Sequence, residues 1–509
     1  MNLLDLPDEI LLCILHKMNV VDALFRQSGL HHRLDQLLFD PIYVRELDFT
    51  IKSWDDSISP LTVEPHAFER ILNNISYPKV SSLLLTNFPS KTLLQHVTGN
   101  NILIQLIVKQ ITHLNINIID EIIDETNNNN DQLNVFELVL SISNCLIEFT
   151  FHQSIKNNHQ CLFIDHLSST NPICSTLTKL DIQVNTFDDC LSLLDGRFPS
   201  LSHFLVYVNY IPSTSSDIDK ITQLSKLKYF SLTNYVGTYF YNDLVVPLIQ
   251  RMSYLEELSL FLTVSRRDTY EVVDGNNLYH DILIQLSQLK IFQFSIYTYL
   301  FNTNVSINDF PSNDDIQRSF NSNRFRQIGS YVQHTPGKTV YGCHVYSLPF
   351  KFKTFIRLST SFSGGIFYHV RMLVANDYVP WEYYFIKKVA ESFPSLEVLL
   401  ISNSHPQKNK SQFNNNNVNT ENLQMITFIR LLDLRVTLTH IDYIEQLLFN
   451  RYTHLPRLCQ LEIDYEQLIT LTNNFTNDQT QLNCLQVQRL IINESFVPPH
   501  NFFLFFPLL

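Results

Sequence analysis

A short pattern of apolar and polar positions recurs along most of the chain. It has the form Φ-x-x-L/F-x-Φ, where Φ is an apolar residue, and successive copies mostly lie 24 to 36 residues apart. Alternation with a period of two predicts a β-strand at each copy, because successive side chains of a strand point to opposite faces. A period of this length is typical of repeat proteins. The copies begin at Val44, Val80, Ile111, Leu146, Leu177, Leu201, Leu227, Leu255, Leu289, Leu396, Leu458 and Val487.

Longer amphipathic stretches precede several of these copies and predict helices. Four of them are residues 187–198, 279–286, 381–393 and 441–452. The boundary between helix and strand also recurs, because a proline there ends the helix and favours an extended backbone. It is present as Tyr77-Pro78, Phe198-Pro199, Phe393-Pro394 and Leu455-Pro456. Alternating helices and strands predict an α/β fold with a parallel sheet.

These units resemble leucine-rich repeats of the longer, helix-containing kind. The resemblance implies a solenoid with a curved parallel sheet on the concave side and helices on the convex side. Asparagine stands at the expected later position in only some copies, namely Asn87, Asn185, Asn209 and Asn234. The alternative is an ordinary α/β domain, but its strands would be continuous apolar runs rather than alternating ones.

The first eighteen residues have a different pattern. Their apolar residues recur at spacings of three and four, which places them along one side of a helix. Pro7 is suited to the start of a helix, and the acidic residues Asp8 and Glu9 suit its first turn. Residues 22–38 continue with helical spacing. So few residues bury too little surface to fold alone, and we expect them to pack on a partner or on the rest of the chain.

This N-terminal segment resembles an F-box, the adaptor-binding module of SCF-type (Skp-cullin-F-box) ubiquitin ligases. The resemblance is carried by Leu6-Pro7-x-Glu9-Ile10-x-x-x-Ile14-Leu15-x-x-Met18, Asp22-Ala23-Leu24 and Leu30-x-x-Arg33-Leu34-x-x-Leu37. Leu34 stands where the family usually has an aromatic residue. The resemblance implies small all-α helices over residues 1–45 that insert into a groove on a Skp-type adaptor. The inserted residues would be Leu6, Pro7, Ile10, Ile14, Leu15 and Met18. Alternatively, the same stripe caps the repeats behind it.

Composition narrows the class of protein further. The net charge of −13 disfavours nucleic acid as a partner, because phosphate binding needs a basic face. No apolar run reaches the ~18–20 residues of a membrane span, and the N-terminus lacks the basic region of a secretory signal. The eight cysteines contain no C-x-x-C motif and read as reduced thiols. We therefore expect a protein of the cytoplasm, the nucleus or both.

One segment has an unusual charge balance. Residues 316–376 contain eight Lys and Arg but no Asp or Glu, and the repeat lapses over about 300–376. This predicts an irregular basic insertion that recognises an acidic or phosphorylated segment of a client. Arg324 and Arg326 are suited to forked contacts with such a segment. The alternative is a solvated face that offsets acidic neighbours within the repeats.

No motif in the chain predicts catalysis. The patterns G-x-S-x-G, G-x-x-x-x-G-K-[ST], G-x-G-x-x-G and H-E-x-x-H are all missing. His31 and His32 are adjacent, but the sequence pattern indicates no third and fourth metal ligand for them. We therefore expect no enzymatic activity, no cofactor and no metal site.

Together these features predict an F-box at residues 1–45 and a leucine-rich-repeat-like solenoid at residues 46–509. The predicted function is the substrate-recognition adaptor subunit of an SCF-type E3 ubiquitin ligase. Its partners would be a Skp-type adaptor, through it a cullin, and a protein client. Candidate client contacts beside the core positions of the strands are His203, Tyr207, Tyr229 and Phe261. The alternative function is a non-catalytic scaffold for protein binding that has no ligase role.

Overall fold

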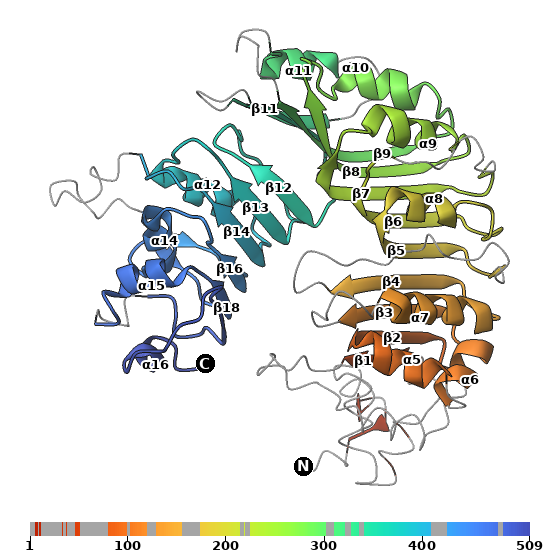
Figure 1. Cartoon of the computed structure of the whole chain (residues 1–509), viewed down its shortest axis with the longest axis horizontal. Helices are drawn as coiled ribbons and strands as arrows, with labels where there is room; N and C mark the ends of the chain where they lie inside the picture. Colours follow the sequence, from red (N-terminus) through yellow and green to blue (C-terminus); the bar gives the residue numbers. More distant parts are fainter. Residues whose placement is uncertain are drawn as a thin grey trace. The chain divides into compact units, whose positions relative to one another are not determined.

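The structure, a computed structural model, forms two compact units (Figure 1). The first contains Met1–Val264 and Asn277–Phe292, and the second contains Ser265–Asn276 and Gln293–Leu509. The structure describes residues 6–8, 10–11, 33, 37, 46–50, 80–98, 102–119, 129–154, 174–213, 218, 224–301, 310–320, 327–334, 340–408, 425–476 and 482–509.

The first unit is built on parallel strands that pair in the order of the chain. They are β1 (Glu46–Thr50), β2 (Ser82–Phe88), β3 (His113–Ile119), β4 (Glu148–Ser154), β5 (Lys179–Thr186), β6 (His203–Tyr210), β7 (Tyr229–Thr238) and most of β8 (Glu257–Arg267). Strands are thus observed where the recurring pattern predicted them over this part of the chain. Their parallel pairing requires a crossover after each strand.

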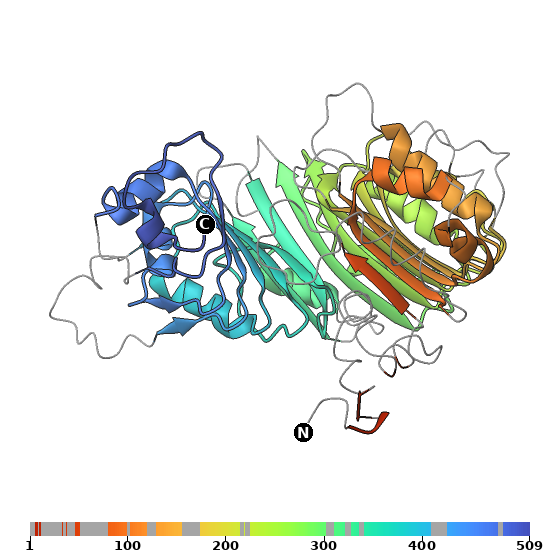
Figure 2. The same ribbon diagram turned by 90° about the horizontal axis from the view of Figure 1, so that it is seen from below.

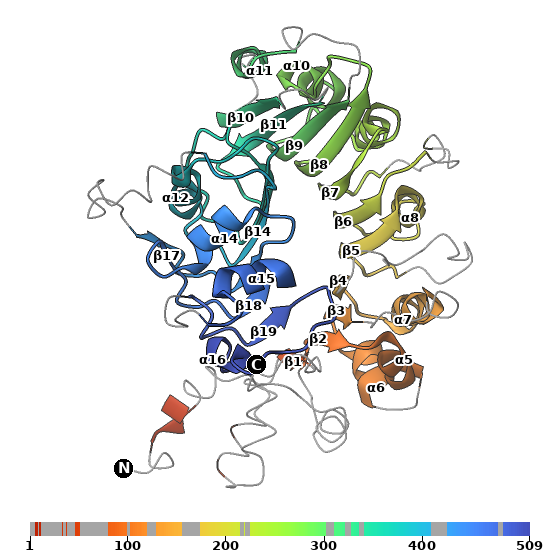
Figure 3. The ribbon, with the colours of Figure 1, turned by 60° about the vertical axis from the view of Figure 1, so that its left-hand side comes forward.

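Helices lie in several of these crossovers, and Figures 2 and 3 show them on one face of the sheet. They are α5 (Ser90–Thr98), α6 (Ile102–Lys109), α7 (Asn129–Ile142), α8 (Phe187–Leu193), η3 (Tyr241–Val245), α9 (Val246–Gln250), α10 (Gly275–Leu278) and η4 (Tyr279–Leu283). The start of α8 has a clear local cause. Thr186 accepts a hydrogen bond from Asp189 N (3.3 Å), and Asp189 Oδ2 accepts one from Thr186 N (2.7 Å). This reciprocal pair satisfies two backbone donors at the helix start.

The core of the first unit consists of two apolar rows that cross the strands. One row joins Leu47, Leu83, Leu114, Phe149, Leu180, Phe204, Phe230 and Leu258, and the other joins Phe49, Leu85, Ile116, Phe151, Ile182, Val206, Leu232 and Leu260. All sixteen side chains are buried. They occupy the last two apolar positions of the recurring pattern, so the alternation identified the core.

The second unit combines antiparallel and parallel strands. β9 (Ile291–Phe301) pairs antiparallel with β11 (Val340–Leu348), which pairs antiparallel with β10 (Gln327–His334). A six-stranded parallel sheet follows, with β12 (Thr354–Leu358), β13 (Met372–Asn376), β14 (Val398–Ser402), β16 (Asp433–Arg435), β18 (Gln460–Glu462) and β19 (Arg489–Ile491). The remaining elements are α11 (Asn313–Ser319), α12 (Tyr383–Ser392), α14 (Ile441–Leu448), α15 (Tyr465–Thr472), α16 (Phe502–Phe505) and the short pair β15 (Ile426–Thr427) and β17 (Thr453–His454).

The predicted fold class is wrong. Small all-α helices followed by a curved leucine-rich-repeat-like solenoid were expected, whereas the main feature is a large mixed sheet of eleven strands in the order β1-β2-β3-β4-β5-β6-β7-β8-β9-β11-β10. A solenoid repeats one structural unit, and here the unit changes. The hairpin of β10 and β11 reverses the strand direction, and residues 359–371, all described, contain no helix. The few described residues between 1 and 45 form no helical domain.

A buried histidine lies in the core of the second unit, among aromatic side chains. His344 of β11 is fully buried, and its ring nitrogens contact Ser295 Oγ (2.9 Å) and Tyr331 Oη (3.0 Å). The rings of Tyr346 and Phe355 lie 5.0 and 5.1 Å from the His344 ring, between centroids. Burial lowers the pKa of His344 from 6.5 to about 3, because the charged imidazolium would lose its hydration.

This pKa predicts a loss of stability in acid. Below pH 6.5 the unfolded chain binds a proton at His344, whereas the folded chain does so only near pH 3. The free energy of unfolding should therefore fall by about 1.4 kcal/mol per pH unit over this window. Urea unfolding of the wild type and of His344→Gln at pH 7, 6 and 5 measures the effect. The free energy of unfolding of the variant should lack this part of the pH dependence. If it falls with pH as steeply as that of the wild type, the low pKa of His344 is contradicted.

Candidate protein-binding site

The described part of the N-terminal segment is a single helical turn. Pro7 O accepts hydrogen bonds from Ile10 N (3.1 Å) and Leu11 N (3.0 Å), so the turn begins at the predicted residue. Arg33 holds it by donating to Leu6 O (2.9 Å) and by an ion pair with Asp8. Leu11 is buried, whereas 47% of Ile10 is exposed. Ile10 is thus an accessible apolar side chain on the predicted docking segment.

Three predicted adaptor contacts lie outside the described residues, namely Ile14, Leu15 and Met18. The same holds for the predicted client contacts Arg324 and Arg326. These five positions stay predictions. Leu6, Pro7 and Ile10 are brought together by the turn at Pro7.

The face of the first sheet opposite its apolar core carries a row of polar and aromatic side chains. Strand pairing places His113, Glu148, Lys179, His203, Tyr229 and Glu257 side by side across β3 to β8, and we call them the polar row. Lys179 Nζ donates to Glu148 Oε2 at 2.8 Å, and this hydrogen bond is the main cause that lowers the pKa of Glu148. The rings of His203 and Tyr229 stack with centroids 5.8 Å apart. Two of the predicted client contacts therefore form one adjacent pair.

A second aromatic group lies four to six residues further along the same strands. Tyr207 of β6 and Phe261 of β8 flank Tyr235 of β7, with ring centroids 5.3 Å and 4.9 Å from it. Phe261, a predicted client contact, is only 2% exposed, so its side chain is not accessible on this surface as that prediction requires. Tyr235 lies edge-on to its ring. Sequence reasoning missed Tyr235, although the alternation that begins at Tyr229 would have placed it on this face.

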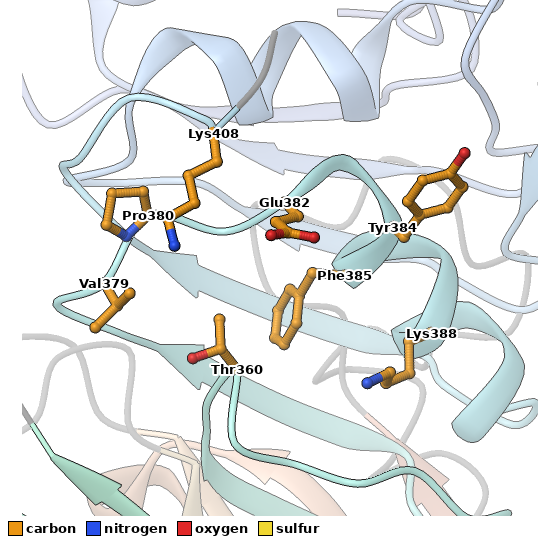
Figure 4. Close-up of a pocket in the computed structure, with 8 residues that line it drawn as sticks. All are labelled: Thr360, Val379, Pro380, Glu382, Tyr384, Phe385, Lys388 and Lys408. Carbon is orange, nitrogen blue, oxygen red and sulfur yellow. The ribbon is translucent and has the colours of Figure 1, made fainter. Parts of the chain in front are cut away.

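The second unit contains a pocket of about 280 Å³ beside the start of α12 (Figure 4). It is lined by Thr360, Val379, Pro380, Glu382, Tyr384, Phe385, Lys388 and Lys408. Figure 4 shows the Phe385 ring and the Glu382 carboxylate between the two lysines. Lys388 Nζ donates to Phe362 O (3.3 Å), and Lys408 N donates to Trp381 O (3.0 Å). The sequence had no motif that indicated this pocket.

One carboxylate positions the wall of this pocket. Asp377 follows β13 and is buried. It accepts hydrogen bonds from Thr360 N (2.9 Å), Thr360 Oγ1 (3.0 Å), Val379 N (3.0 Å), Tyr378 N (2.8 Å), Gln333 Nε2 (2.7 Å) and Trp381 Nε1 (3.4 Å). Two of the donating residues line the pocket, so Asp377 holds the loop after β12 against the loop after β13.

The polar row contains stacked rings and paired charges, and the pocket is lined by two lysines, a glutamate and the aromatic side chains of Tyr384 and Phe385. Within the described residues, no cluster of three or more His, Cys, Asp or Glu side chains is arranged to hold a metal ion. None of the helices in the described part of the chain combines the length and apolar character that a bilayer span requires. The six described cysteines are free thiols.

Comparison of the chain with protein-family models and with curated proteins finds no match. The resemblance of the N-terminal segment to an F-box therefore stays a prediction.

Asp377 provides a test of how the pocket is held. Asp377→Ala leaves several buried donors without an acceptor and should lower the free energy of unfolding by at least about 3 kcal/mol. Asp377→Asn keeps one acceptor oxygen, so its free energy of unfolding should lie between those of the wild type and of Asp377→Ala. Glu391→Ala is the control, because its ion pair with Lys387 is exposed and 3.8 Å long, and it should cost less than about 1 kcal/mol. Similar urea midpoints for Asp377→Ala and Glu391→Ala would contradict the role of Asp377.

Proposed function

We propose that this chain is the substrate-recognition adaptor subunit of an SCF-type E3 ubiquitin ligase, acting in the cytoplasm, the nucleus or both. The observation that carries the proposal is the segment Leu6-Pro7-x-Glu9-Ile10, with its turn at Pro7 and its exposed Ile10. An amphipathic helix of this kind suits a hydrophobic groove on a Skp-type adaptor. Each buried Leu or Ile would contribute about 1.5–3 kcal/mol before the costs of association.

The chain would act by proximity and not by catalysis. The N-terminal segment would bind the adaptor and, through it, a cullin, while another surface binds the client. Ubiquitin transfer then gains from the raised effective concentration of the client beside the loaded ligase. The absence of a recognisable catalytic motif in the sequence agrees with this division of labour.

The polar row is the surface that we propose for the client. Stacked His203 and Tyr229 form an aromatic patch, and tyrosine is enriched among residues that dominate protein interfaces. Around it, the paired Glu148 and Lys179 offer charge for complementarity, which favours specificity and association rate. Such an extended row is better suited to a protein surface than to a small molecule.

A pull-down with a purified Skp-type adaptor tests the proposed function. The wild-type chain should retain the adaptor, and the double variant Pro7→Ala, Ile10→Asp should retain at most about a tenth as much, because a carboxylate at position 10 cannot enter an apolar groove without a large desolvation cost. Circular dichroism and urea unfolding should show that the variant remains folded.

The matched control is Ile284→Asp. Ile284 is exposed to the same extent as Ile10 (48% against 47%) but lies after η4, away from the docking segment in sequence. This variant should retain the adaptor as the wild type does. A wild-type chain that does not bind the adaptor would contradict the ligase proposal and favour the scaffold function.

A further inference from the structure

Arg357 of β12 has an unusual backbone conformation. Its φ is 59°, in the left-handed region, and the pairing of β12 with β13 shifts register between Phe355 and Leu358. Residues other than Gly, Asn and Asp adopt this backbone conformation at a cost in free energy, because their Cβ atom crowds the following carbonyl oxygen. Such a bulge turns a side chain in a direction that a regular strand does not allow. The identity of residue 357 therefore needs an explanation.

The strand contacts around Arg357 do not provide that explanation. Tyr331 Oη donates a hydrogen bond to the backbone oxygen of Arg357 (3.0 Å). This bond helps to hold the bulge, but any residue at position 357 would keep it. Glycine would fit the backbone better. The presence of arginine at position 357 is therefore explained by the interactions of its side chain.

The guanidinium of Arg357 lies on an aromatic platform. Its central carbon is 5.7 Å from the ring centroid of Tyr297 and 5.6 Å from that of Tyr299, both on β9. These are cation–π distances, and stacking on rings restricts the orientation of the guanidinium. Gly342 of β11 makes room for the platform, because a Cβ there would lie 2.0 Å from Tyr297 Oη.

The platform opens into a small recess with no acidic wall. It has a volume of about 10 Å³ and is lined by Tyr297, Tyr299, Gln333, Gly342, Arg357, Asn376 and Tyr378. Among the described residues, Arg357 forms no ion pair. Asn376 Oδ1 is buried there without a hydrogen-bond partner. A half-buried guanidinium has five N–H donors, so an acceptor from outside the chain would stabilise it.

We propose that Arg357 and the surrounding tyrosines form a binding site for an oxyanion on a protein segment, either the carboxylate of an acidic side chain or the phosphate of a phosphorylated one. The recess has room for about one oxygen atom. One ligand oxygen enters it, and the guanidinium donates to the other oxygen of a carboxylate or, as a fork, to two further oxygens of a phosphate. Asn376 lies in the same wall, and rotation of its amide presents an N–H donor to the ligand.

Local charge supports this choice of ligand. Arg357 belongs to the segment 316–376, which contains eight basic and no acidic residues. The neighbouring Asp377 is buried and accepts hydrogen bonds from the surrounding backbone and side chains, so it is engaged within the chain. Assigning this site to client recognition rests on the adaptor function proposed above, whereas oxyanion binding itself does not.

Peptide pools with randomised flanks and one fixed central residue test the proposal directly. The fixed residue is phosphoserine, phosphotyrosine, glutamate or serine, and retention on the immobilised full-length chain is measured for each pool. We expect at least one of the three anionic pools to be retained at least tenfold more than the serine pool. Preference for a phosphorylated residue or for glutamate identifies the source of the oxyanion. Equal retention of all four pools would overturn the proposal.

Three variants separate binding from folding. In Arg357→Gly, retention of the preferred anionic pool relative to the serine pool should fall at least tenfold. The melting temperature should be unchanged or higher, because glycine relieves the positive φ. Gly342→Ala should weaken binding with Arg357 still present, by displacing Tyr297. Arg318→Ala is the matched control, since this exposed arginine of the same segment pairs with Asp315 on α11, and it should bind as the wild type does.

Each result has a distinct meaning. Undiminished peptide retention by Arg357→Gly would refute the site, and so would a marked fall in its melting temperature, which would assign the arginine to folding. Arg357→Gly should still be retained by the Skp-type adaptor. A wild-type chain that prefers anionic peptides but does not bind the adaptor would refute the ligase function and leave the oxyanion site intact.

Discussion

The register of the parallel strands is the constraint on which the first unit depends. Strand by strand, the pairing aligns two apolar residues with two on the next strand, which produces the buried rows from Leu47 to Leu258 and from Phe49 to Leu260. A slip of one residue would move every member of a strand to the opposite face. The same register gives the helices an apolar surface to cover and aligns the polar row on the other face. Core and proposed client surface are therefore two results of one pairing pattern.

The second unit depends more on buried polar atoms. Asp377 joins loops after β12 and β13 through hydrogen bonds, and His344 stays neutral between Ser295 and Tyr331. Buried polar groups are costly when unpaired, so each such network restricts the unit to one arrangement. Arg357 contrasts with them, because its guanidinium has aromatic neighbours but no acidic partner among the described residues. We therefore assign Arg357 to ligand binding, and Asp377 and His344 to stabilisation of the fold.

The two proposed interactions use different physical effects. Adaptor binding would rest on burial of apolar side chains, of which Ile10 is the described example, and would depend little on salt. Client binding through Arg357 would rest on charge-assisted hydrogen bonds, and client binding through the polar row on stacked rings and paired charges. Changes at one surface can therefore be tested without altering the chemistry of the other.

The sequence by itself determined which segments of the first unit are strands and which side chains are buried, because apolar alternation is a local property. It also placed the first helical turn at Pro7 and brought His203 and Tyr229 into one candidate surface. The antiparallel hairpin of β10 and β11, and with it the fold class, was decided only by the tertiary structure. So were the burial of Phe261 beside Tyr235, the pocket held by Asp377 and the setting of Arg357 on Tyr297 and Tyr299. These features arise from contacts between residues far apart in the chain, which no local pattern encodes.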